Sequence, residues 1–258
     1  MKIGDYVTRK SYNNDIIFKI VDIDGDICYL KGVSVRLCAD STIDDLLLCD
    51  IKKDIEDNRK FLDKIKDRKL ERNDYFYLPG KILHLDGDSE YLNRCLKYYE
   101  DINIMAMGIV IDEVDMPSKI NELLNTYNPN ILVITGHDAY YKKKGDIYNI
   151  NAYKNSKNFI DTVKNARKYE SSHQKLIIIA GACQSDYEEL IKAGANFASS
   201  PKRINIHALD PAIIASRMSL SDSNVEIDLK DIIENTKYGS NGIGGIITKG
   251  TMYRVYPR

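Results

Sequence analysis

Two residues of this 258-residue sequence combine types and positions that could perform covalent chemistry. His137 comes directly after the apolar residues 131–136, and Cys183 comes directly after the apolar residues 176–182. A thiolate beside an imidazole is the nucleophile and base pair of cysteine-dependent acyl transfer. Either residue alone after a strand is more often a packing residue, but both at corresponding strand ends favour a catalytic pair.

The elements expected to position this pair are parallel β-strands separated by amphipathic helices. Near-continuous apolar strands alternating with such helices predict an α/β fold, with a mostly parallel sheet and helices on both faces. Functional groups of open parallel sheets gather beyond the carboxyl ends of the strands. Neighbouring strands would therefore bring His137 and Cys183 to one rim. The expected strands are residues 82–85, 107–111, 131–135 and 176–180.

The residues after Cys183 predict a helix whose start would stabilise a thiolate. Ser185 and Glu188 have the spacing of a capping box, and Gly194 is a typical helix end. The partial positive charge of a helix N-terminus favours the ionised form of a nearby thiol, as does an imidazolium. The backbone N–H of Cys183 is the expected first donor of an oxyanion hole.

The remaining histidines and cysteines fit a catalytic role less well. His207 stays a weaker alternative base, whereas His84 lies within an expected strand and His173 lies in a polar loop. Five cysteines without a CxxC pair argue against a disulfide framework and a structural zinc site. We therefore expect no metal and no organic cofactor. The cysteines interpreted as packing residues are Cys28, Cys38, Cys49 and Cys95.

Composition and charge argue against nucleic acid and membranes as partners. The net charge is −1 and the pI is about 6.4, so no overall field attracts an anionic polymer or surface. The first residues lack the apolar segment of a secretory signal, and no apolar run is long enough to cross a bilayer. We expect a cytoplasmic protein whose thiols stay free.

Three segments of different character follow one another along the chain. Residues 1–48 predict a small SH3-like β module, because short β-prone runs are joined by a turn at Asp24-Gly25-Asp26. Residues 49–78 carry closely spaced charges of both signs and predict a solvated helical linker. Residues 79–258 form the expected α/β domain.

The motifs around the two candidate catalytic residues resemble a known peptidase group. Gly136-His137 and Ala182-Cys183, each ending an apolar strand, are similar to the catalytic motifs of caspase-like (clan CD) peptidases. The resemblance implies a caspase-like fold with Cys183 as nucleophile and His137 as general base. Glycine follows the histidine in that group, whereas Asp138 stands here, so the second oxyanion donor would be the N–H of Asp138.

Longer stretches resemble the YabG family of sporulation-specific proteases over nearly the whole chain. This resemblance implies a cysteine endopeptidase of the mother cell that cleaves after Arg and processes spore-coat and cortex-associated proteins. Self-cleavage after Arg59, Arg68 or Arg72 of the linker is a further hypothesis. The stretches are residues 4–7, 131–138, 148–149, 153–157, 180–185, 193–201 and 241–244.

Cleavage after Arg requires an acidic S1 pocket, because a buried guanidinium pairs with a carboxylate in bidentate geometry. In caspase-like folds the residue that contacts this side chain lies at the end of the first strand. Asp86 and Asp88 occupy that place, and Asp112 or Glu113 after the second strand are the next candidates. An ordinary turn and helix cap is an equally open interpretation of Asp86-Gly87-Asp88.

A non-enzymatic protein is the alternative from a different functional class. A flavodoxin-like sheet could serve spore assembly or ligand binding, with Asp86-Gly87-Asp88 and residues 241–244 contacting the ligand. The first strand is not followed by a phosphate-binding glycine motif, which argues against a nucleotide site. The sequence leaves the oligomeric state and the identity of the substrates open.

Overall fold

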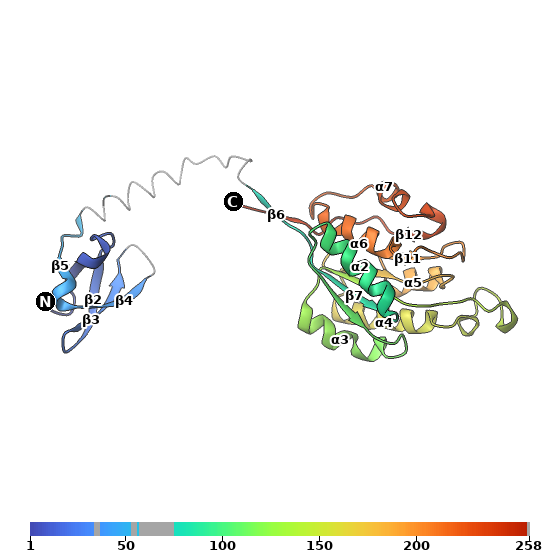
Figure 1. Ribbon diagram of the computed structural model, residues 1–258, viewed down its shortest axis with the longest axis horizontal. Coiled ribbons are helices and arrows are strands. Elements are labelled where there is room, and N and C mark those ends of the chain that lie inside the picture. Colours follow the sequence, from blue (N-terminus) through green and yellow to red (C-terminus); the bar gives the residue numbers. More distant parts are fainter. Residues whose placement is uncertain (34–36, 53–55, 57–74, 257–258) are drawn as a thin grey trace. The chain divides into compact units, whose positions relative to one another are not determined.

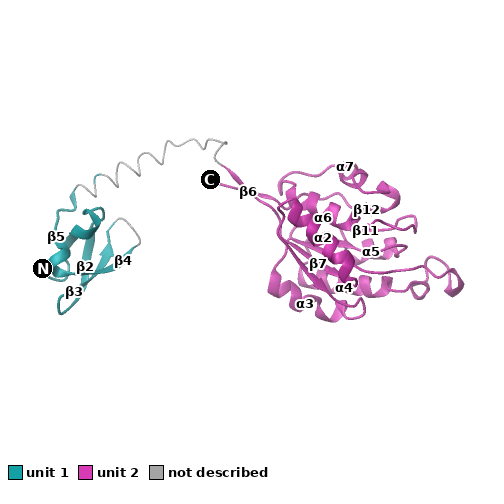
Figure 2. Cartoon of the chain, viewed as in Figure 1, with its two compact units in different colours: residues 1–72 teal, residues 73–258 magenta. Residues whose placement is uncertain are grey.

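The computed structural model describes residues 1–33, 37–52, 56 and 75–256 of the chain. The chain divides into two compact units, residues 1–72 and residues 73–258 (Figure 2). Most of the expected helical linker, with its three arginines, lies outside the described residues. No helix in the described ranges is both long and apolar enough to cross a membrane.

The first unit is built on a five-stranded antiparallel sheet with the order β4-β3-β2-β1-β5. The turn expected at Asp24-Gly25-Asp26 joins β2 to β3, and Gly25 adopts a positive φ of 59° there. Alternate side chains of the strands form a separate small core that includes Phe18 and Leu30. The strands are β1 (Tyr6–Arg9), β2 (Phe18–Asp24), β3 (Ile27–Gly32), β4 (Cys38–Thr42) and β5 (Leu46–Leu48).

The second unit contains a six-stranded sheet with the order β12-β11-β10-β9-β7-β8 (Figure 1). All neighbouring pairs are parallel except β11 with β12, which confirms the parallel-rich α/β prediction. The expected strands are present with ends shifted by one residue or less. The strands are β7 (Ile82–Asp86), β8 (Ala106–Val110), β9 (Ile131–Thr135), β10 (Ile177–Ala180), β11 (Phe197–Ser199) and β12 (Ile243–Gly245).

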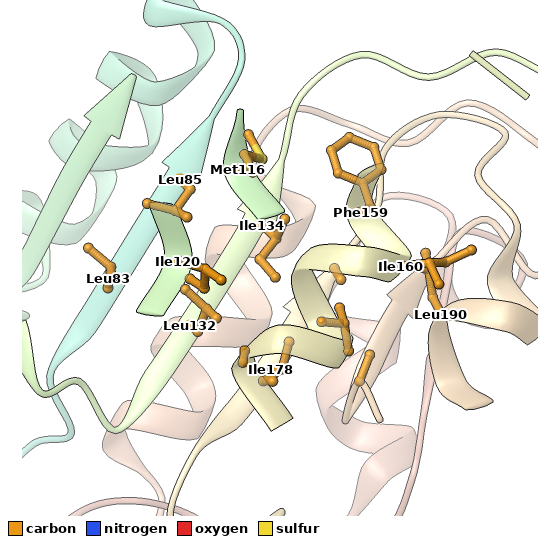
Figure 3. Packing of buried hydrophobic residues seen from close by; sticks show 14 of the residues in the cluster. Leu83, Leu85, Met116, Ile120, Leu132, Ile134, Phe159, Ile160, Ile178 and Leu190 are labelled. Atoms are coloured by element: carbon orange, nitrogen blue, oxygen red, sulfur yellow. The ribbon is translucent and has the colours of Figure 1, made fainter. Parts of the chain in front are cut away.

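Helices cover both faces of this sheet because its strands are apolar on both sides. In β9, Leu132 and Ile134 face one helical layer, whereas Ile131 and Val133 face the other. Figure 3 shows the first of these cores, in which Leu132 of β9 packs in one cluster with Ile120 of α3 and Phe159 of α4. That layer holds α3 (Met116–Tyr127), α4 (Ser156–Tyr169) and α5 (Tyr187–Ala193), and the other holds α2 (Ser89–Asp101), α6 (Asp210–Leu220) and α7 (Leu229–Glu234).

The strand order places a topological switch between β7 and β9. The chain moves outward from β7 to β8 through α2, and then returns through α3 to β9 on the other side of β7. Ligands of doubly wound sheets bind in the crevice at such a switch, outside the carboxyl ends of the strands. Asp86 is the last residue of β7 and His137 follows β9, so both lie at this switch.

Between β9 and α4 the chain forms a projecting arm, residues 139–154, coloured yellow-green in Figure 1. Its base is a short antiparallel contact, where the Tyr141 N–H donates to the Ala152 carbonyl over 2.7 Å. Two 3-10 turns, Lys142–Lys144 and Ile150–Ala152, shape the rest. A separate two-stranded sheet joins β6 (Phe76–Leu78) to β13 (Tyr253–Val255).

Candidate active site

A cavity of about 290 Å³ lies at the carboxyl ends of β7, β9 and β10. The pairing of β9 with β10, expected from the sequence, places Ile134 beside Ala180 and so brings the two following loops together. His137 and Cys183 line the same cavity. Its other lining residues are Asp86, Tyr91, Arg94, Thr135, Gly136, Gly181, Ala182, Ile206, His207, Ala208 and Pro211.

Cys183 is partly buried and its sulfur contacts one backbone segment across the cavity. The Ile206 N–H donates to the sulfur over 3.3 Å, and the sulfur lies 3.7 Å from the Ile206 carbonyl. Gly181 adopts a φ of 104°, a left-handed conformation that turns the chain away from β10. The thiol is therefore held at the cavity wall by the segment that leads into α6.

His137 is oriented by contacts to its ring and to its backbone. Its Nε2–H donates to Asp88 Oδ2 over 3.0 Å, and the Tyr91 ring lies 5.6 Å from the imidazole between centroids. The His137 N–H donates to Glu113 Oε1 over 2.7 Å, and its carbonyl accepts from Asn155 Nδ2 over 2.7 Å. Among the described residues, none forms a hydrogen bond with Nδ1 of this ring.

Asp88 serves two partners with its two carboxylate oxygens. Oδ1 caps α2 by accepting the N–H groups of Glu90 and Tyr91, while Oδ2 accepts from His137. The hydrogen bond from His137 and those from the helix start lower the pKa of Asp88. Asp88 thus holds the imidazole of His137 and the start of α2, contacts that differ from the S1 role expected from the sequence.

Asp86 lies at the end of β7 and is almost fully buried in the cavity wall. Its Oδ1 accepts the Asp88 N–H over 2.8 Å, and its Oδ2 accepts the Thr135 hydroxyl over 2.7 Å. Burial raises the pKa of Asp86, and the hydrogen bonds from Thr135 and the Asp88 N–H and the nearby His137 offset this rise only in part.

A buried hydrogen-bonded series leads from Asp86 into the core. Because the Thr135 hydroxyl donates to Asp86, it accepts from His84 Nε2–H over 2.9 Å, and His84 Nδ1 then accepts from the Tyr99 hydroxyl over 3.0 Å. Burial lowers the pKa of His84 to about 3, so its imidazole is neutral. The series fixes the orientation of the Asp86 carboxylate.

Asp138 joins the histidine loop to the cysteine loop. Its Oδ2 accepts from Ser185 over 2.8 Å and from Ser156 over 2.5 Å, and its Oδ1 accepts the N–H of Ala139 and of Asn155. The Ser185 hydroxyl also accepts the Ala182 N–H over 2.9 Å.

The expected capping box at Ser185 is wrong because that hydroxyl is already engaged with Asp138 and Ala182. Helix α5 begins at Tyr187, and Asp186 is its N-cap, accepting the Glu189 N–H. Gly194 ends the helix with a φ of 113°, as expected. The helix therefore starts four residues after Cys183, one residue later than the sequence indicated.

The two carboxylates that follow β8 do not line the cavity. Asp112 is exposed, and Glu113 packs its carboxylate against Gly87 and Gly136 while accepting the His137 N–H. Of the four acidic residues considered for S1, only Asp86 faces the cavity that contains Cys183.

Three functional candidates in the cavity wall have weaker signals in the sequence. Tyr91 and Arg94 lie three residues apart on one face of α2, and Arg94 pairs with Glu90. His207 is exposed, and its Nδ1 accepts the Leu209 N–H over 3.2 Å. The loop before α6 brings His207 to the same cavity as His137, a placement that depends on the path of the chain between β11 and α6 and not on a local sequence pattern.

Within the ranges that the structure describes, no three His, Cys, Asp or Glu side chains gather where they could bind a metal ion.

The sequence model of the YabG peptidase U57 family matches residues 2–257. The sporulation-specific protease YabG of Bacillus subtilis (strain 168) is 44% identical over 280 residues, covering 97% of this chain and 96% of the relative. On both grounds, the chain belongs to the YabG family of peptidases.

Proposed function

We propose that this peptidase is a cysteine endopeptidase in which Cys183 is the nucleophile and His137 the general base. The observation that carries the proposal is the shared cavity of these two residues, with Asp88 hydrogen-bonded to the imidazole. The Cys183 sulfur attacks the scissile carbonyl as His137 Nδ1 takes its proton. The imidazolium then protonates the leaving amine, and water, deprotonated by the same imidazole, hydrolyses the thioester.

Two backbone N–H groups are available to stabilise the tetrahedral oxyanion. Within the part of the chain that the structure describes, neither the Cys183 N–H nor the Asp138 N–H donates a hydrogen bond. Preorganised N–H donors of this kind contribute about 10²–10³ each to the rate of acyl transfer. We assign both to the oxyanion hole.

Cleavage after Arg is the specificity that the cavity supports best. The Asp86 carboxylate is buried at the cavity wall, held by Thr135 and the Asp88 N–H, and a substrate guanidinium would replace its lost hydration. Asp88 is engaged by His137, and Asp112 and Glu113 lie outside the cavity, so Asp86 is our choice for S1.

The proposed biological role follows from the family. The relative in Bacillus subtilis is named a sporulation-specific protease. We propose that this chain acts in the mother cell during sporulation, on spore-coat and cortex-associated proteins, and cuts its own linker after Arg59, Arg68 or Arg72. A caspase-like fold for residues 79–258 and an SH3-like fold for residues 1–48 belong to the same proposal.

The test compares peptides with Arg, Lys, Asp or Asn before the scissile bond. We expect the wild-type chain to prefer Arg, Cys183→Ala to be inactive, and Asp86→Asn to lose the preference for Arg. Asp112→Asn is the matched control, since it removes the same charge outside the cavity. Activity retained by Cys183→Ala would refute the nucleophile, and an unchanged Arg preference in Asp86→Asn would refute the S1 assignment.

A further inference from the structure

A second groove, of about 670 Å³, lies beside the Cys183 loop and is separate from the catalytic cavity. The projecting arm forms one wall with Tyr140, Lys142 and Ile147. The other lining residues are Gln184, Glu188, Pro201, Lys202 and Arg203. Gln184 directly follows the nucleophile in the chain, so the groove begins next to the catalytic centre.

The two walls are joined by hydrogen bonds that do not involve the lysines. The Tyr140 N–H donates to Gln184 Oε1 over 3.2 Å, and Arg203 Nε donates to the Tyr153 hydroxyl over 2.8 Å. The Tyr153 hydroxyl in turn donates to the Ile147 carbonyl over 2.8 Å. The groove is therefore formed before any ligand enters, which lowers the entropic cost of binding.

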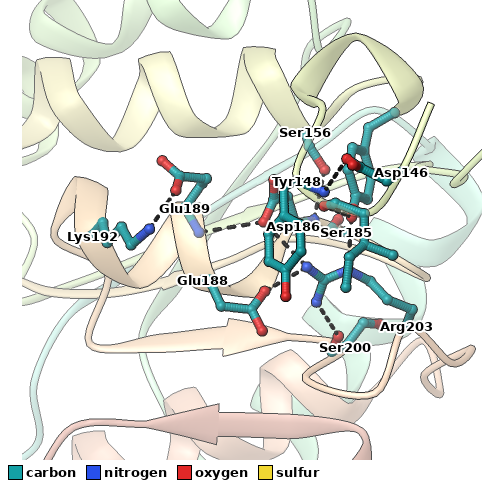
Figure 4. A network of polar contacts seen from close by, with 12 residues as sticks. Asp146, Tyr148, Ser156, Ser185, Asp186, Glu188, Glu189, Lys192, Ser200 and Arg203 are labelled. Atoms are coloured by element: carbon teal, nitrogen blue, oxygen red, sulfur yellow. Dashed lines mark hydrogen bonds and ion pairs between the residues drawn. The ribbon is translucent and has the colours of Figure 1, made fainter. Parts of the chain in front are cut away.

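The cationic groups of the groove differ in how far their charge is compensated. Arg203 is almost buried and pairs with Asp186 over 3.3 Å and with Glu188, as Figure 4 shows for this polar network. Lys142 and Lys202 are exposed, and neither forms an ion pair or side-chain hydrogen bond with any described residue. Glu188 lines the same groove and its carboxylate is paired with Arg203, so Lys142 and Lys202 give the groove a net positive charge.

We propose that this groove is a substrate subsite that binds acidic side chains near the scissile bond, with Lys142 and Lys202 as its specificity-determining residues. An extended peptide advances about 3.3 Å per residue. A chain that passes Cys183 therefore brings residues a few positions from the scissile bond between the two lysines. The inference deepens the proposed peptidase function, and it concerns a different group of residues from the S1 assignment.

The experiment measures peptide binding separately from cleavage. Fluorescein-labelled peptides carry one Arg with three Glu, three Ala or three Lys on its N-terminal or C-terminal side, and their affinity for the Cys183→Ala chain is read by anisotropy. We expect the Glu peptides of one side to bind about tenfold more tightly than the Ala peptides, and the Lys peptides to bind more weakly. The preference should decrease with salt, because the lysines are exposed.

The variants show whether the preference comes from this groove. Lys142→Glu and Lys202→Glu should each reduce the Glu-to-Ala affinity ratio about threefold, and Lys142→Arg should retain it. Lys230→Glu in α7 is the matched control and should leave the ratio unchanged, because this exposed lysine lies outside both cavities.

Equal affinities of the three peptides, or a ratio that Lys142→Glu and Lys202→Glu reduce no more than Lys230→Glu does, would overturn the inference. Failure of the peptidase proposal would look different. In that case Cys183→Ala would still cleave, or the wild-type chain would ignore the residue before the scissile bond, while the initial anisotropy would still decide the groove.

Discussion

Ser185 connects the loop that carries His137 to the loop that carries Cys183, and replacing it with alanine tests how strongly the two loops are coupled. Its fully buried hydroxyl donates to Asp138 Oδ2 over 2.8 Å and accepts the Ala182 N–H over 2.9 Å. A hydrogen bond to a charged group contributes about 1.5–3 kcal/mol, and a buried donor left unpaired costs about 1–3 kcal/mol. Since local relaxation recovers part of this sum, we expect Ser185→Ala to lower the free energy of unfolding by about 3 kcal/mol.

Calorimetric unfolding of the full chain measures this loss, in a Cys183→Ala background so that self-cleavage cannot contribute. For a unit of this size, about 3 kcal/mol lowers Tm by about 6–12 °C. Ser118→Ala is the control, because its hydroxyl bonds the Asp115 carbonyl over 2.8 Å at the surface and should contribute less than about 0.5 kcal/mol. A Tm shift for Ser185→Ala as small as that of Ser118→Ala would refute the coupling of the loops.

Three further outcomes follow from the same region. Asp88→Asn keeps the helix cap but turns an amide donor toward His137, so kcat should fall about thirtyfold or more while Tm stays close to wild type; an unchanged kcat would contradict the orienting role. Burial lowers the pKa of His84 from 6.5 to about 3, so the unfolded state binds the extra proton between these values and stability falls as pH drops below 6.5. Urea unfolding at pH 7, 6, 5 and 4 should show that His84→Asn removes a slope of up to about 1.4 kcal/mol per pH unit, and an equal slope in both chains would exclude this source. Iodoacetamide at neutral pH should label Cys183 and not Cys95, whose pKa burial raises to about 12; mass spectrometry of the native chain reads the difference, and equal labelling would contradict it.

The meeting of His137 and Cys183 at one cavity was predictable because it depends on regular elements. Two continuous apolar runs that end in Gly136-His137 and Ala182-Cys183 had to become buried strands, and adjacent parallel strands place their ends at one rim. The Asp24-Gly25-Asp26 turn and the Gly194 helix end were likewise predictable, because each depends on a few neighbouring residues.

The supporting contacts were not predictable because they join residues that are distant in the sequence. Asp88 and His137 are 49 residues apart, and Asp138 and Ser185 are 47 residues apart. Local pattern made Ser185 a helix cap, but its tertiary bond to Asp138 takes precedence and leaves Asp186 to cap α5. His207 lines the cavity because of the path that the chain takes between β11 and α6, and the spacing of apolar residues in the sequence does not predict this path.

The carboxylate of Glu113 has a consequence for how the sequence can vary. It fills the space beside Gly87 and Gly136, so that a methyl group at either glycine would collide with it, and the same carboxylate accepts the His137 N–H. A larger residue at either glycine therefore displaces the acceptor of the His137 N–H. Positions 87 and 113 are therefore expected to vary together, since an alanine at Gly87 requires the Glu113 carboxylate to move or to be shortened, whereas Gly136, with a φ of 159°, disfavours any side chain.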